Sequence, residues 1–166
     1  MEKQIVNLGK LNYELNKNNF SASVIRSPKA YGKVFIPKTI IFESQEYSVI
    51  KISEDAFPIK NNKIVAINFP ENSNVKTIES YSIHAYTLSK INIPQSIENL
   101  GECWCKNTRF LKNIPISLKN KHFKYKDEEK HLIFCKSDQN SDCFDSILFG
   151  DRNIIKLILP DYIKHI

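Results

Sequence analysis

The chain has 166 residues, the length of one ordinary domain, and 42% of them are hydrophobic, which is enough to form a core. Its net charge of +6 would suit an anionic partner such as nucleic acid or a membrane surface. The chain is also rich in Ile and Asn, which share A/T-rich codons with Lys, so biased coding accounts for the charge and nucleic-acid binding is not expected. No stretch reaches the roughly 18 apolar residues of a membrane span.

The first twenty residues, MEKQIVNLGKLNYELNKNNF, lack the apolar segment of a signal peptide. By itself this start predicts a cytoplasmic location.

Residues 11–47 are expected to form an N-terminal β cap. Residues 11–25 (LNYELNKNNFSASVI) alternate imperfectly around a polar KNN turn, which is typical of a hairpin. Val34, Ile36 and Pro37 then imitate the end of a repeat strand. Such a cap is needed because the first unit of a repeat stack has no neighbour to cover it.

Residues 48–118 contain three copies of one apolar pattern. The copy within residues 75–100 places apolar residues and a proline at Val75, Ile78, Ile83, Leu88, Ile91, Ile93 and Pro94. The same order runs from Val49 to Pro70, and again from Ile97 to Ile116. Self-similarity at a period of roughly 20–29 residues with an L-x-x-L-x-L core indicates leucine-rich repeats.

This pattern predicts a leucine-rich-repeat solenoid of the α/β horseshoe class, β-rich with short helical turns. One copy cannot bury its own apolar face, but stacked copies form a continuous core. Stacking would place Ile67, Ile91 and Ile114 in one column. The neighbouring column would hold Phe69, Ile93 and Ile116.

The motifs also resemble a known family. Ile52 to Phe57 (ISEDAF) and Ile78 to Ile83 (IESYSI), with the L-x-x-I-x-I-P-x-S-I run from Leu88 to Ile97, are similar to BspA-like leucine-rich-repeat proteins. Many of these are predicted surface antigens of bacteria and parasitic protists. The resemblance therefore implies a location at the cell surface, in conflict with the absent signal peptide.

The outward positions of the repeat strands form the candidate protein-binding face. They alternate with the buried columns and are free to vary without harming the core. Asn68 above Asn92 would be placed for a short amide ladder, and both are expected to face water. The candidate residues are Ala66, Asn68, Ser89, Lys90, Asn92, Lys112 and Asn113.

The period is lost over residues 119–150, where HLIFC and SILF flank a polar loop. This segment is expected to be an inserted β-hairpin. Residues 151–166 restart the repeat at Ile154 and are expected to be a truncated further copy, so that residues 1–166 form a single leucine-rich-repeat domain.

No residues match a catalytic, cofactor or metal motif. Cys103, Cys105, Cys135 and Cys143 have no standard zinc spacing. Cys105 falls in the column of Phe57 and Ile83, so it is expected in the core, and free thiols are expected without a secretory signal. A Cys135–Cys143 disulfide, a zinc site and a cysteine hydrolase using Cys105 or Cys135 remain as alternatives.

The sequence therefore favours a non-catalytic module without cofactors that binds a protein partner. The family resemblance implies adhesion or surface-antigen roles, with a host or extracellular-matrix protein as the partner. The alternative is an intracellular leucine-rich-repeat scaffold, which fits the absent signal peptide.

Overall fold

Strands dominate the computed structural model, which describes residues 3–59, 63–112, 114–125, 132–138, 140, 142–150 and 161–166. The thirteen elements defined in these ranges are all strands, joined mainly by tight turns where short helical turns were expected. Their bounds are β1 Lys3–Leu8, β2 Leu11–Asn16, β3 Ser21–Ile25, β4 Tyr31–Phe35, β5 Thr39–Phe42, β6 Gln45–Ile52, β7 Lys63–Asn68, β8 Thr77–Ile78, β9 Lys90–Ile91, β10 Asn99–Leu100, β11 Phe123–Tyr125, β12 Leu132–Cys135 and β13 Ser146–Gly150.

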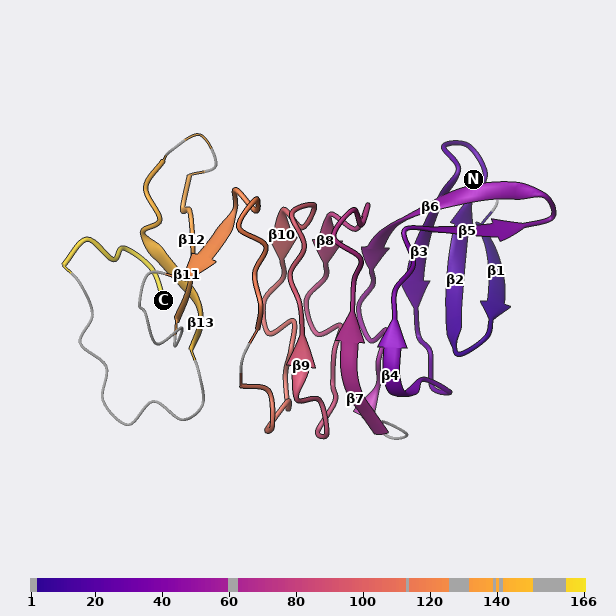
Figure 1. Cartoon of the computed structure of the whole chain (residues 1–166), viewed down its shortest axis with the longest axis horizontal. Helices are drawn as coiled ribbons and strands as arrows, with labels where there is room; N and C mark the ends of the chain where they lie inside the picture. Colours follow the sequence, from indigo (N-terminus) through magenta and orange to yellow (C-terminus); the bar gives the residue numbers. More distant parts are fainter. Residues whose placement is uncertain are drawn as a thin grey trace.

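The longest sheet has the strand order β1-β2-β3-β6-β8-β10, with β5 paired to β6 (Figure 1). Its first three strands are antiparallel, and β2 and β3 form the hairpin expected within residues 11–25. Along β3, β6, β8 and β10 the pairing is parallel, and Val24, Ile52, Ile78 and Leu100 share one row, whereas β5 pairs with β6 antiparallel. This parallel pairing begins inside residues 11–47, so part of the expected cap already belongs to the repeat ladder.

A second sheet, β4-β7-β9, is parallel throughout. Val34 pairs with Ile67, and Ile67 pairs with Ile91, as the predicted column requires. Ile93 pairs with Ile116 in the neighbouring column. Val34 to Pro37, residues 64–70 and Leu88 to Pro94 therefore occupy equivalent places in three successive units.

The core lies between these two sheets. Ile52 and Ile78 from the first sheet and Ile67 and Ile91 from the second have no exposed surface and belong to one apolar cluster. Complete burial of a side chain of this size contributes about 1.5–3 kcal/mol. Each unit supplies only a few such residues, so the core is built by stacking.

Three successive units also turn at the same point through a left-handed residue that is not glycine. Asp55, Tyr81 and Cys103 have φ values of 51°, 54° and 49°. The Asp55 N–H donates to the Tyr81 carbonyl, and the Tyr81 N–H donates to the Glu102 carbonyl, each at 3.2 Å. Contacts between neighbouring units therefore hold a conformation that the side chains themselves disfavour.

A small antiparallel sheet, β11-β12-β13, follows the repeats at their C-terminal end (Figure 1). Phe123 and Ile133 are buried in the common core, and the rings of Trp104 and Phe149 lie 6.4 Å apart. The Tyr125 hydroxyl donates to the Ile114 carbonyl at 2.9 Å and accepts from the Ile114 N–H at 3.3 Å. This sheet therefore covers the last repeat strand rather than standing apart from it.

The final described residues return to this small sheet. The Asp145 carboxylate accepts hydrogen bonds from the Ser137 N–H and hydroxyl and pairs with Lys164 at 2.8 Å. These contacts, the Lys164 hydrogen bond foremost, hold the pKa of Asp145 well below its ordinary value. Ser146 bridges to His165. Most of the expected further repeat, residues 151–160, lies outside the described residues.

Candidate functional site

Five of the predicted candidate residues lie on β7 or on and directly beside β9: Ala66, Asn68, Ser89, Lys90 and Asn92. Ser89, Lys90 and Lys112 are exposed, and the Ser89 hydroxyl donates to the Val65 carbonyl at 3.1 Å. Asn68 is half-buried. Asn113 lies outside the described residues.

Ala66 is buried, with 6% of its surface exposed, and cannot present its side chain to a partner as predicted. Its register explains the burial, because Ala66 pairs with Lys33 on one side and Lys90 on the other. The stems of long lysine side chains cover apolar surface beside them. Val65, which is 45% exposed, lies at the register shift between β4 and β7.

Asn92 was predicted to face water, but its amide group binds the backbone of the preceding unit. Its Nδ2 donates to the Phe69 carbonyl and its Oδ1 accepts from the Phe69 N–H, both at 2.9 Å. Between the next two units, the Ser117 N–H donates to the Ile93 carbonyl. The equivalent acceptor one unit earlier is the Phe69 carbonyl, and the residue equivalent to Ser117 is Pro94. Proline has no N–H and cannot make this hydrogen bond. Asn92 therefore replaces a missing ladder hydrogen bond, and its amide is not in a ladder with Asn68.

Sequence reasoning did not include β4 in this face. Tyr31, Lys33 and Phe35 are exposed on β4, with exposed fractions of 56% for Tyr31 and 58% for Phe35, and they alternate with the half-buried Gly32 and the buried Val34. The Lys10 ammonium lies 3.6 Å from the centre of the Tyr31 ring, a cation–π contact. The signal for these residues was Val34-x-Ile36-Pro37, which matches the repeat strands but was assigned only to a cap.

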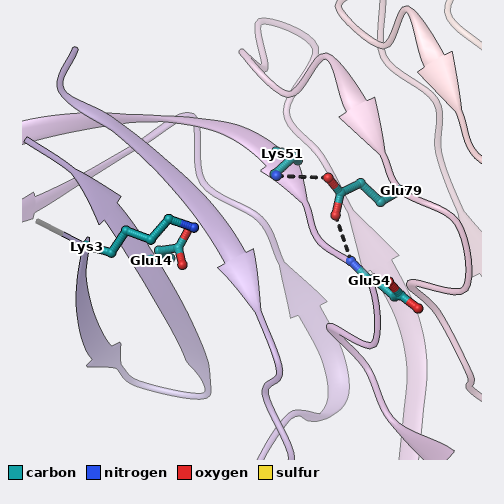
Figure 2. Close-up of polar contacts among 5 residues, drawn as sticks. All are labelled: Lys3, Glu14, Lys51, Glu54 and Glu79. Carbon is teal, nitrogen blue, oxygen red and sulfur yellow. Dashed lines mark hydrogen bonds and ion pairs between the residues drawn. The ribbon is translucent and has the colours of Figure 1, made fainter. Parts of the chain in front are cut away.

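The two sheets differ in how their lysines are paired. Along the longer sheet, Lys3 pairs with Glu14 at 3.0 Å and Lys76 with Glu98 at 3.2 Å. Lys51 pairs with Glu79 at 2.9 Å (Figure 2). By contrast, β4, β7 and β9 contain no Asp or Glu. Three exposed lysines of these strands, Lys33, Lys63 and Lys90, form no ion pair within the described ranges, and neither does the exposed Lys112 of the next unit.

Glu79 also ties two units of the longer sheet together. Its second carboxylate oxygen accepts the Glu54 backbone N–H at 3.0 Å, and Figure 2 shows the carboxylate between Lys51 and this N–H. Burial alone would raise the pKa of Glu79, but the hydrogen bonds from Lys51 and Glu54 and the charge of Lys51 outweigh it and lower that pKa. These three lysines of the longer sheet are therefore paired with carboxylates, whereas the exposed lysines of β4, β7 and β9 are not within the described residues.

The four cysteines lie at different depths: Cys105 is buried, Cys135 is half-buried, and Cys103 and Cys143 are exposed. They form no disulfide, and in the described part of the chain no three His, Cys, Asp or Glu residues are grouped to hold a metal ion. Cys105 is buried in the column of Phe57 and Ile83, as predicted. Burial, with a further contribution from Asp145, raises the pKa of the Cys135 thiol, which makes it less nucleophilic at neutral pH.

Comparison with known proteins supports the fold through structure alone. No protein-family model matches the chain, and no curated protein matches its sequence. A leucine-rich repeat protein from Bacteroides ovatus superimposes with a TM-score of 0.57 and 24% identity, over 70% of this chain and 30% of that one. The chain has a leucine-rich-repeat fold.

Two other leucine-rich-repeat comparisons are looser. The pneumococcal vaccine antigen PcpA aligns at 17% identity and a TM-score of 0.47, over 71% of this chain and 39% of its own. A leucine rich cell surface protein from Faecalibacterium prausnitzii aligns at 12% identity and a TM-score of 0.37, over 82% and 59%. This chain thus spans less than two thirds of each of these three proteins. Within its described residues, no helix is long and apolar enough to cross a membrane.

Proposed function

We propose that this chain is a segment of a BspA-like leucine-rich-repeat solenoid that acts as a non-catalytic protein-binding module. The observation that carries the proposal is the outer face of the β4-β7-β9 sheet. This face presents lysines and exposed aromatic rings, and its strands contain no carboxylate.

The composition of this face suits binding by charge and aromatic contact. Lys90 and Lys112 come from successive units, while Tyr31 and Phe35 extend the face onto β4. Aromatic side chains supply much of the energy of protein interfaces, and complementary charge raises the rate and specificity of association. The proposed partner is therefore a protein with an acidic surface.

A pull-down comparing the wild-type chain with Lys90→Glu/Lys112→Glu tests the face. The matched control is Lys17→Glu/Lys29→Glu, which makes the same charge change at exposed positions away from β7 and β9. Partners of the face should be lost only with the first variant, and their capture should weaken as salt screens the charges. Equal losses in both variants would reject the face as the binding surface.

The role in the cell is proposed as adhesion or surface antigen, on the resemblance of the repeat motif. An intracellular scaffold that binds a protein partner is the alternative. Localisation of a tagged chain in its own cells separates the two. Staining confined to the cytosol would remove the adhesion proposal.

A further inference from the structure

The two main sheets are unequal in length at their N-terminal end. Beyond β3, the longer sheet continues into β2 and β1, whereas the shorter sheet stops at β4, which pairs only with β7 in the described residues (Figure 1). The place beside β4 that a further strand would fill is thus not occupied by a strand in that part of the chain. An exposed edge of this kind is a template for pairing with another chain.

The backbone of β4 has groups that face this edge. The Ile36 N–H donates towards β7, to the Asn68 carbonyl at 2.9 Å. Backbone groups alternate in direction along a strand, so the N–H and C=O groups of Lys33 and Phe35 face the open side. The Tyr31 carbonyl, on the same side, accepts a hydrogen bond from Lys10 Nζ at 3.2 Å. This edge can therefore accept and donate hydrogen bonds to an added strand.

A hollow of about 330 Å³ lies along this edge, between β4 and the β1–β2 hairpin. Its apolar lining includes Leu8 and Tyr13 from the hairpin and Phe35 from β4. Lys10 and Lys33 line it as well, and no carboxylate does. The hollow thus has an apolar wall, a backbone edge and two positive charges.

We propose that this edge binds an extended acidic peptide segment of another protein, which adds to β4 as a fourth strand of the short sheet. Side chains of an added strand alternate between two faces. Apolar side chains on one face would contact Leu8 and Tyr13, and acidic side chains on the other would reach Lys10 and Lys33. Pairing with a second copy is disfavoured because it would bring the lysines of two edges together. The site is the edge of the sheet; it adjoins the face assigned above and shares Lys33 and Phe35 with it, but lies two strands from Lys90.

A labelled peptide of alternating glutamate and valine is the probe, and its lysine-for-glutamate counterpart is the control. Fluorescence anisotropy at low salt measures binding to the intact chain. Amide NMR with hydrogen exchange then shows which N–H groups become protected. We expect saturable binding of the acidic peptide alone, with new protection at Lys33 and Phe35.

Variants separate the edge from the face. Lys33→Glu should weaken binding at least about tenfold, whereas Lys90→Glu, the same change two strands away in the same row, should leave it nearly unchanged. Phe35→Pro removes an edge N–H and should abolish binding, because proline is tolerated on edge strands but cannot donate. Phe35→Ala keeps that N–H and separates its loss from the loss of the ring. Circular dichroism verifies that each variant is folded.

Several results would overturn the proposal. Absence of saturable binding below about 1 mM would mean that the lysines only protect the edge from pairing. Equal weakening by Lys33→Glu and Lys90→Glu would place the peptide on the face. Protection elsewhere than Lys33 and Phe35, or a dimer that forms through this edge in light scattering, would also refute it.

Discussion

Asn92→Ala tests the hydrogen bonds that join one repeat to the next at Pro94. The substitution removes both contacts to the partly buried Phe69 backbone, each 2.9 Å long. A hydrogen bond of this type contributes about 1 kcal/mol net, so we expect a loss of about 2 kcal/mol in the free energy of unfolding. For a chain of this size, that lowers Tm by roughly 4–8 °C.

The assay is urea and thermal unfolding followed by circular dichroism. Lys90→Ala, an exposed position on the same short segment, is the matched control and should change stability by less than about 0.5 kcal/mol. Asn92→Asp adds a sharper comparison, because it keeps an acceptor for the Phe69 N–H but places a carboxylate oxygen against the Phe69 carbonyl. If Asn92→Ala and Lys90→Ala unfold alike, Asn92 does not replace the ladder bond.

Two further changes probe the ends of the stack. Tyr125→Phe removes the hydroxyl that both donates to and accepts from the Ile114 backbone. It should lower the free energy of unfolding by about 1–2 kcal/mol and increase amide exchange in β11, β12 and β13. Unaltered exchange there would show that the small sheet does not depend on this contact. At the other end, burial raises the pKa of Tyr13 to about 12. An unfolded tyrosine ionises near pH 10, so the stability from neutral Tyr13 is complete below about pH 10 and is lost as the pH rises through about 12. Urea unfolding across this pH range should show that the free energy of unfolding falls by at most about 3 kcal/mol, and that this fall is absent in Tyr13→Phe. An equal fall at alkaline pH in Tyr13→Phe would show that other groups cause it.

The periodic apolar pattern was sufficient to predict the repeat columns. Ile67 and Ile91 pair as expected, and Cys105 is buried in the column of Phe57 and Ile83. The prediction succeeded because residues that are buried at a fixed spacing must be apolar, and that spacing can be read directly from the sequence. The hairpin in residues 11–25 was predicted for the same reason, since a polar turn between alternating segments is a local signal.

The candidate face was predicted less well, because exposure depends on neighbours that are distant in the sequence. Ala66 alternates as an outward residue should, yet the flanking Lys33 and Lys90 bury it. Asn92 also alternates outward, but the absent N–H of Pro94 draws its amide to Phe69. Pro94 was visible in the sequence, whereas the carbonyl it leaves without a donor belongs to another repeat.

The sequence by itself determined the repeat, its period and its core residues, because these follow from local alternation of apolar and polar side chains. Only the tertiary structure decided that β4 is the edge of a repeat sheet, and that β11, β12 and β13 cover its far end. Both depend on pairing between segments far apart along the chain. Which segments pair at the two ends depends on the apolar surface and backbone groups that the stacked repeats leave exposed there. No single segment of the sequence specifies this pairing.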